Sequence, residues 1–250
     1  LLRDSYSTGA RYGQLDLDRI VAGLTLSPDG DLAIHPKGLM AVEHYLVVRN
    51  LMYRSIYNHR LNVVCNWLLQ RLVRLARQLG PNQVWADAVM TRWLWTTDQL
   101  NLGCFLNNDD LRTGYHLQRW QEEGPEQLAQ LCSRFLDRNL LKAIAVEHLN
   151  REEQLQALAI AGRLVERQGM EASLCCGLRH QELRGYDPYR GGLRLWDGHR
   201  MQALEDVSPL VASLATPAAS SWLIYPREIQ RDLKAALDVE WVVPPTPLRG

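Results

Sequence analysis

The clearest pattern of apolar and polar residues runs from Leu39 to Leu79. Apolar residues recur there at spacings of three and four, without a single Gly or Pro, and the stretch ends at Gly80–Pro81. This spacing places the apolar side chains on one side of a helix, and Gly followed by Pro ends a helix. The pattern therefore predicts one long helix, or two nearly continuous ones, mostly buried.

Helical spacing recurs in six further segments of the chain. They are residues 15–24, 83–105, 111–121, 126–136, 151–169 and 227–237. Ser208–Pro209 opens a short helical piece as well, because serine suits the N-cap and proline suits the first turn. Most of the chain is therefore expected to be helical.

Strand signals are confined to short segments. Residues 27–38 carry a Pro-Asp-Gly turn signal beside short apolar stretches, which predicts a small hairpin. Beyond Gly169, short apolar alternations between Gly, Asp and Pro predict two or three strands, and residues 221–226 predict another. The expected class is mainly α: the C-terminal part of a helical domain at 1–168, a small α+β lobe at 169–242 and a Pro-rich tail at 243–250.

Composition narrows the class of protein. Lys plus Arg and Asp plus Glu both number 28, so the formal net charge is zero. This balance does not suggest a nucleic-acid partner or a membrane surface. No apolar run approaches the roughly 18 residues of a membrane span, and no targeting segment is visible. We expect a cytoplasmic location.

Cysteine and histidine spacing gives no metal or redox motif. The five cysteines are scattered apart from Cys175–Cys176, with no CxxC, which is typical of reduced thiols. The seven histidines are isolated, and no dinucleotide, Walker or GxSxG motif is present. Asp109–Asp110 is interpreted as a solvated helix start. We therefore assign no metal ligand and no catalytic residue to this chain.

One strip of the long predicted helix has unusual chemistry. Arg49 lies between apolar neighbours, and Tyr53 and Tyr57 follow at i+4 and i+8, each about 40° further round the helix. A guanidinium in apolar surroundings must be paired, because desolvating it alone is costly. One interpretation is a structural ion pair with tyrosines packed beside it. The other is a pocket wall in which the guanidinium binds phosphate and a phenol ring packs on a sugar or base.

Asp4 is the carboxylate that could complete such a wall. It lies one turn beyond a leucine pair in the opening sequence LLRDS. From the residues alone it could equally be an ion-pair partner or a solvated residue at the end of a helix.

Several segments together resemble a known family. They are LLRDSYSTGARYGQLDLDRI, KGLMAVEHYLVVRNLMYRSIYNH and RNLLKAI, with Asp98 in TTDQL and Arg138–Lys142 in RNLLK at plausible distances. In this order they resemble the HD-domain phosphohydrolases, and most closely the branch that contains the deoxynucleoside triphosphate triphosphohydrolases. The resemblance covers residues 1–170 well and the remaining lobe more loosely. It implies that the helical domain is of the HD type.

The resemblance also implies roles for individual residues. Asp4 matches the Asp that approaches the sugar of the nucleotide, Arg49 matches an Arg that contacts the phosphates, and Tyr57 matches a Tyr beside the sugar and base. Tyr53 stands where some members have His, and we include it with the other three as a predicted substrate contact. His59 and Arg60 lie where regulated members approach a second, activating nucleotide.

The family holds a divalent metal ion with a His, a His-Asp pair and a later Asp, and its members split a nucleotide into nucleoside and triphosphate. These ligands would precede Leu1 and are absent from this sequence. We expect the chain to be the C-terminal portion of such a phosphohydrolase, with the missing N-terminal HD segment as its partner. The full-length parent would use the metal to hydrolyse (deoxy)nucleoside triphosphates or related phosphoesters. Without its ligands the chain alone is expected to be inactive.

An alternative stays open. The chain could be a non-catalytic helical binding or regulatory module derived from the HD fold, used through a protein partner. An upstream reading frame encoding the His…His-Asp…Asp pattern would favour the phosphohydrolase, and a start codon near Leu1 would favour the module. Homo-oligomerisation is compatible with both, and neither the nucleotide nor regulation by a second nucleotide follows from the sequence.

Overall fold

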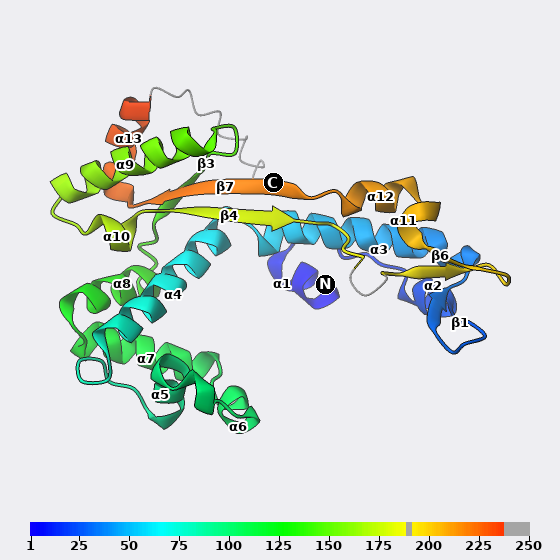
Figure 1. The fold of residues 1–250 in the computed structure, drawn as a ribbon, viewed down its shortest axis with the longest axis horizontal. Helices are drawn as coiled ribbons and strands as arrows, with labels where there is room; N and C mark the ends of the chain where they lie inside the picture. Colours follow the sequence, from blue (N-terminus) through cyan, green and yellow to red (C-terminus); the bar gives the residue numbers. More distant parts are fainter. Residues whose placement is uncertain (189–191, 238–250) are drawn as a thin grey trace. The chain divides into compact units, whose positions relative to one another are not determined.

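The computed structural model describes residues 1–188 and 192–237 (Figure 1). These residues form two compact units. Unit 1 comprises residues 1–59 and 180–220, and unit 2 comprises residues 60–179 and the chain from Ser221 onward. Helices dominate both units and the strands are short, so the predicted class, mainly α with a small α+β part, is confirmed. The predicted tail at 243–250 lies outside the described residues.

Unit 1 combines helices from the start of the chain with strands from two distant segments. Its helical elements are α1 (Leu2–Thr8), α2 (Leu17–Ala22), η1 (Pro36–Gly38), α3 (Leu39–Met52), the π-helical segment η2 (Tyr53–Tyr57), α11 (Leu204–Val207) and α12 (Pro209–Ala215). Its strands are β1 (Leu24–Leu26), β2 (Leu32–Ile34), β5 (Arg194–Trp196) and β6 (Met201–Ala203).

The sheet of unit 1 has the strand order β1-β2-β5-β6. The predicted hairpin is confirmed: β1 and β2 pair antiparallel, with Leu24 opposite Ile34. Ile34 then pairs in parallel with Leu195, which joins this hairpin to the β5–β6 hairpin more than a hundred residues later. Ser208 caps α12 by accepting a hydrogen bond from the Val211 amide, as its sequence position predicts.

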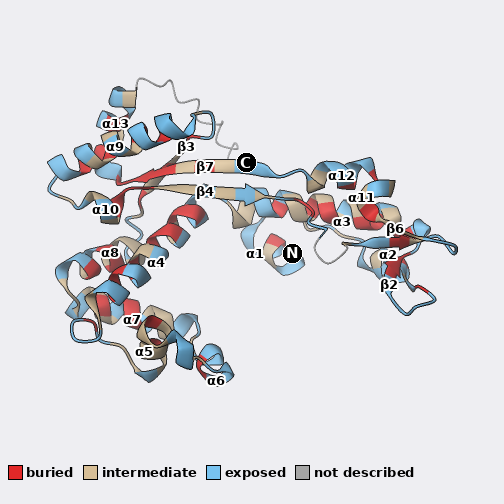
Figure 2. Cartoon of the chain, in the orientation of Figure 1, coloured by how far each residue is buried: buried red, intermediate tan, exposed pale blue. Residues whose placement is uncertain are grey.

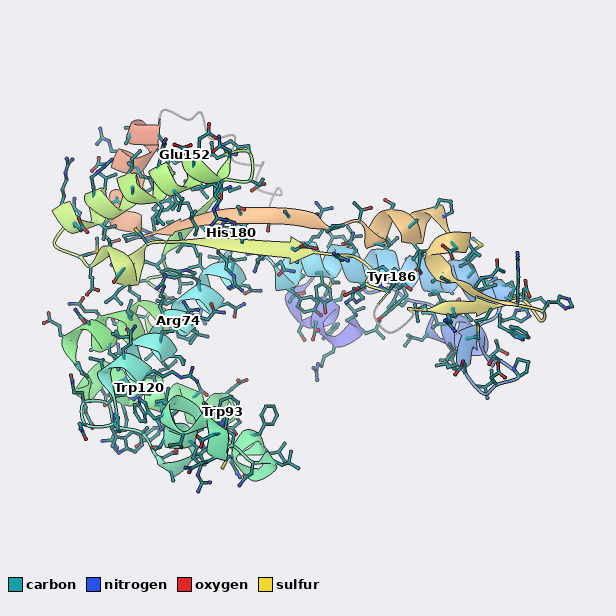
Figure 3. All side chains as sticks on the ribbon, in the orientation of Figure 1. Arg74, Trp93, Trp120, Glu152, His180 and Tyr186 are labelled. Carbon is teal, nitrogen blue, oxygen red and sulfur yellow. The ribbon has the colours of Figure 1, made fainter. Side chains whose placement is uncertain are left out.

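The core of unit 1 lies between α3 and the second hairpin with its following helices. Tyr186, labelled in Figure 3, is 4% exposed within it. The other buried members are Ile34, Val42, Leu46, Leu195, Leu204 and Val211. This packing fixes α3, the helix that carries Arg49.

Unit 2 is built around α4 (Arg60–Leu79), which continues the chain after η2. Its other helical elements are α5 (Ala88–Trp95), η3 (Thr97–Gln99), α6 (Leu102–Leu106), α7 (Asp110–Glu123), α8 (Glu126–Leu136), α9 (Arg151–Arg167), α10 (Ala172–Cys175), η5 (Arg227–Ile229) and α13 (Gln230–Leu237). A three-stranded sheet has the order β3-β7-β4, from β3 (Lys142–Ala145), β4 (Gly177–Leu183) and β7 (Ala218–Tyr225). Strands β4 and β7 each continue into the chain of unit 1.

Two apolar clusters stabilise unit 2. One packs α4, α5, α7 and α8 around buried residues such as Leu68 and Leu72, with Trp93 and Trp120 among these helices (Figure 3). The other packs α9, α10 and α13 against β7. Buried and exposed residues alternate in stripes along α4 and α9 (Figure 2), so each helix buries one face.

The predicted helices at 111–121, 126–136 and 151–169 are confirmed as α7, α8 and α9. The long stretch from Leu39 to Leu79 forms two nearly continuous helices, as predicted, but each buries one face rather than most of its surface. The prediction of one helix over residues 83–105 is wrong. Asp87 and Asn101 each accept a backbone hydrogen bond as N-caps, which starts α5 and α6 separately, and Thr96 leaves helical geometry at φ −133°.

Unit 1 takes residues from both sides of the boundary predicted at residue 168. The predicted division of the chain at residue 168 therefore stays a prediction. Strand β3, at Lys142–Ala145, had not been predicted, and it pairs antiparallel with β7, with Ala143 opposite Ile224.

Candidate functional site

All four residues predicted to contact a substrate lie in unit 1 and form one connected row. Arg49 lies in the last turn of α3, Tyr53 and Tyr57 begin and end η2, and Asp4 lies in α1. In this row Arg49 contacts Tyr53, Tyr53 contacts Tyr57, and Tyr57 bonds to Asp4. The helical spacing accounts for the proximity of Arg49, Tyr53 and Tyr57, whereas Asp4 reaches the row from a separate helix. Their role as substrate contacts stays a prediction.

Arg49 is half-buried and contacts a carbonyl oxygen and an aromatic ring. Its Nη1 donates a hydrogen bond to the Gly185 carbonyl oxygen at 2.8 Å, and its Cζ lies 4.4 Å from the centroid of the Tyr53 ring. Among the described residues, no ion pair involves Arg49. A carbonyl and a ring face stabilise a guanidinium without neutralising its charge. The structural ion pair considered from the sequence is therefore not formed within this part of the chain.

Gly185 can approach Arg49 because it has no side chain. A Cβ atom there would lie 2.9 Å from Leu214 Cδ2 and 3.0 Å from the Asn50 side chain. The neighbouring Tyr186 amide donates to the Leu214 carbonyl oxygen at 3.0 Å, which holds this segment in place. The contact links residues 136 positions apart, so no local sequence pattern could have indicated it.

The two tyrosines connect Arg49 to Asp4. Their ring centroids lie 5.0 Å apart, with the planes at 66°, an edge-to-face arrangement. The Tyr57 hydroxyl donates a short hydrogen bond to Asp4 Oδ2. This hydrogen bond is the main reason why the pKa of Asp4 lies below its usual value. The same bond, with some burial, raises the pKa of Tyr57.

Ser5 fixes the position of α1. It is buried, its Oγ accepts a hydrogen bond from the Gly13 amide at 2.9 Å, and it donates a short hydrogen bond to the Ala10 carbonyl oxygen. A Cβ at Gly13 would lie only 2.5 Å from Ser5 Cβ, so glycine is required for this close approach. The loop after α1 is thereby packed against the helix next to Asp4.

An open groove adjoins Asp4. Its volume is about 470 Å³. It is lined by Leu1, Leu2, Arg3, Asp4, Leu15, Leu17 and Tyr45. The groove therefore combines an apolar wall with the charged side chains of Arg3 and Asp4.

A second group of cations lies in unit 2. Burial lowers the pKa of Lys142, and the positive charges of Arg227 and Arg60 lower it further. The resemblance places Arg60 where regulated members approach a second nucleotide, and Lys142 belongs to its RNLLK segment. Arg227 had not been identified from the sequence. Arg138 precedes β3 in a left-handed backbone conformation, with φ 56°. Arg60, Lys142 and Arg227 therefore concentrate positive charge where α4 and β3 begin.

Unit 2 also contains a polar cluster whose charged and polar groups bond to one another. Arg112 Nη1 forms an ion pair with Asp87 Oδ2, and Arg112 Nε donates to the Asn107 carbonyl oxygen at 2.6 Å. His116 is 0% exposed, with Nε2 accepting from the Asp87 amide at 3.2 Å and Nδ1 bonded to the Arg112 carbonyl oxygen at 2.8 Å. Asp109 caps α7, as its position at a helix start predicts. This cluster joins α5 to α7.

The described residues do not fit a divalent metal ion. In residues 1–188 and 192–237, no three His, Cys, Asp or Glu side chains come close enough together to bind one. The five cysteines are free thiols, and burial raises the pKa of Cys132 and Cys176 to about 12. Over the same residues, no helix is both long and apolar enough to cross a bilayer.

Comparison with known proteins places the chain in a family. The family model described as the HD associated region matches residues 15–169. The uncharacterized protein YwfO of Bacillus subtilis is 28% identical over 193 residues, which cover 77% of this chain and 44% of that protein. The uncharacterized protein MJ1154 of Methanocaldococcus jannaschii is 38% identical over 76 residues, covering 29% of this chain and 17% of that protein.

Solved structures share the fold. A phosphohydrolase from Bacteroides thetaiotaomicron has a TM-score of 0.73 at 22% identity, covering 91% of this chain and 60% of its own. A hypothetical protein from Aquifex aeolicus has a TM-score of 0.65 at 19% identity, covering 94% of this chain and 55% of its own. The chain thus spans about half the length of these structural relatives and 44% of YwfO. The family match over residues 15–169 shows that this chain belongs to the HD associated region family.

Proposed function

We propose that this chain forms the phosphate- and sugar-contacting wall of the nucleotide site in an HD-type metal-dependent phosphohydrolase. The substrate would be a (deoxy)nucleoside triphosphate or a related phosphoester. The observation that carries the proposal is Arg49, a half-buried guanidinium without an acidic partner among the described residues, at one end of a row that ends at Asp4.

The charge of Arg49 is available to an anion. Nη1 of Arg49 bonds to the Gly185 carbonyl oxygen, and one face of its guanidinium plane lies on the Tyr53 ring. A guanidinium has five N–H donors in a planar fork, which suits two oxygens of a phosphate. Arg49 would therefore bind and orient the phosphates.

Asp4 and the tyrosines suit the uncharged part of a nucleotide. A carboxylate with a lowered pKa accepts hydrogen bonds at neutral pH, as a sugar hydroxyl requires. The exposed ring of Tyr53 and the apolar wall of the adjoining groove offer surface on which a sugar or base can pack. A cation at one end of the row and a carboxylate at the other would suit the phosphate and the sugar of a nucleotide.

The metal chemistry would come from residues outside this chain. When bound, a divalent ion would activate water or polarise the phosphate. Because the described residues do not fit such an ion, this chain would supply binding and orientation only.

The test is hydrolysis by the longer protein that contains the metal ligands. A panel of deoxynucleoside triphosphates is incubated with and without divalent metal, and released triphosphate is measured. We expect metal-dependent release from at least one nucleotide. No hydrolysis and no nucleotide binding, together with a stable complex with a protein partner, would instead support the non-catalytic module.

A further inference from the structure

The row from Arg49 to Asp4 passes through a wide helical turn. Segment η2, Tyr53–Tyr57, is π-helical between the α-helices α3 and α4. The Asn58 amide closes it by donating to the Tyr53 carbonyl oxygen at 2.8 Å, a bond that spans five residues. Wide turns of this kind are rare and often mark functional sites.

The wide turn changes where Tyr57 points. In an α-helix, side chains four residues apart lie about 40° apart round the axis, so Tyr57 would lie about 80° from Arg49. A π turn holds about 4.4 residues, so four residues fall short of a full turn and rotate the side chain back by about 30°. Tyr57 is thereby returned toward the line set by Arg49 and Tyr53.

This realignment accounts for the double contact of Tyr53. The Tyr53 ring lies under the Arg49 guanidinium and also meets the Tyr57 ring edge-to-face. The Tyr57 hydroxyl, at the far end, reaches Asp4. All these contacts lie within unit 1.

Asn58 reinforces the turn with its side chain. Its Nδ2 donates to the same Tyr53 carbonyl oxygen at 2.9 Å, so both N–H groups of one residue hold one acceptor. Asn58 then leaves helical geometry, with φ −106° and ψ 22°. Any non-proline residue supplies the backbone amide, but the second donor needs a short side-chain amide.

We propose that Asn58 is a positioning residue of the nucleotide site: its side chain holds the π turn closed and thereby keeps the Tyr57 hydroxyl on Asp4. The consequence for ligand binding rests on the proposed function, whereas the consequence for Tyr57 does not.

The experiment compares the wild-type chain with Asn58→Leu, which has similar size but no donor, and with Asn58→Ser, which is smaller and polar. The chain is labelled at its tyrosine rings, the Tyr57 signal is assigned with Tyr57→Phe, and its phenol is titrated by NMR between about pH 8 and about pH 12. Asp4, Tyr53 and Arg3 are the ionisable groups that act on Tyr57.

In the wild type we expect Tyr57 to titrate above the ordinary tyrosine range. In both variants it should titrate at lower pH, because the hydrogen bond to Asp4 is weakened. Unchanged titration of Tyr57 in a folded variant would overturn the proposal. Asn58→Ser keeps the test decisive if Asn58→Leu does not fold.

A second measurement separates this inference from the proposed function. Binding of inorganic triphosphate should weaken roughly threefold to tenfold in the folded variants. If neither wild type nor variants bind triphosphate, the nucleotide site is contradicted, while the Tyr57 titration still decides whether Asn58 positions Tyr57.

Discussion

Two half-buried arginines, one in each unit, show how differently a guanidinium can be accommodated. Arg112 in unit 2 forms an ion pair with Asp87, and the pair is tied to buried His116. Arg49 in unit 1 has a carbonyl oxygen and an aromatic ring as partners, and among the described residues it forms no ion pair. The first arrangement joins two helices. The second is the arrangement that we propose binds an external anion.

The largest difference between the two arginines is expected in catalysis. In the proposed full-length phosphohydrolase, Arg49→Ala should lower the rate of nucleotide hydrolysis by at least about a hundredfold, because a preorganised charge on the phosphates is lost. Arg112→Ala should change that rate by no more than a few-fold as long as the protein stays folded. Near-wild-type hydrolysis by Arg49→Ala would remove Arg49 from the site.

For the free energy of unfolding we expect the opposite order, with Arg112→Ala having the larger effect. Arg112→Ala should lower the free energy of unfolding by about 1–3 kcal/mol, because it leaves Asp87 without its cation and breaks the bond to Asn107. Arg49→Ala should cost less than about 1 kcal/mol, since only a carbonyl bond and a ring contact are lost. Urea unfolding of this chain measures both. The comparison fails if Arg49→Ala is the more destabilising change.

Acid should weaken unit 2 through Asp87. Burial raises the pKa of Asp87, but the Met90 amide, His116 and Arg112 outweigh burial and hold the pKa below its usual value. A carboxyl with a lowered folded-state pKa adds stability above its unfolded pKa of about 3.9, and that stability is lost as pH falls through the folded-state value.

Urea midpoints measured from neutral pH down through about pH 3 should therefore fall more for the wild type than for Asp87→Asn. Asp4, whose pKa is also lowered, provides the matched variant Asp4→Asn in unit 1. Equal acid sensitivity of Asp87→Asn and wild type would show that the Asp87 pair does not stabilise unit 2.

The smallest effect concerns the ring beneath Arg49. Tyr53→Leu keeps apolar bulk but removes the ring face, which is worth about 0.5–1 kcal/mol to a cation. We expect triphosphate binding to weaken roughly twofold to fivefold, measured by calorimetry. An unchanged affinity would show that Arg49 does not need Tyr53 as a support.

Local features of the site could be predicted from the sequence, and distant ones could not. The proximity of Arg49, Tyr53 and Tyr57 could be predicted, because residues four positions apart are neighbours on the surface of one helix. The π turn that aligns them could not be predicted, because the spacing of apolar residues does not distinguish a single π turn from a continuous α-helix. The contact with Gly185 depends on packing of a segment 136 residues away.

The same division holds for the fold. The helices at 126–136 and 151–169 could be predicted because each buries a continuous stripe. The prediction of one helix over 83–105 was wrong because the side chains of Asp87 and Asn101 accept hydrogen bonds from backbone amides. Each of these residues thereby begins a separate helix. The parallel pairing of β2 with β5 could not be predicted, since it depends on two hairpins far apart in sequence.

The central claim is that Arg49 offers an unneutralised charge to a polyphosphate. The most direct test is titration calorimetry of inorganic triphosphate into this chain, comparing wild type with Arg49→Ala and with Arg54→Ala, which removes an exposed charge from the same helical stretch. We predict that Arg49→Ala weakens binding by at least tenfold, that Arg54→Ala changes it less than threefold, and that salt weakens the wild type most. Equal losses in the two variants would contradict the claim.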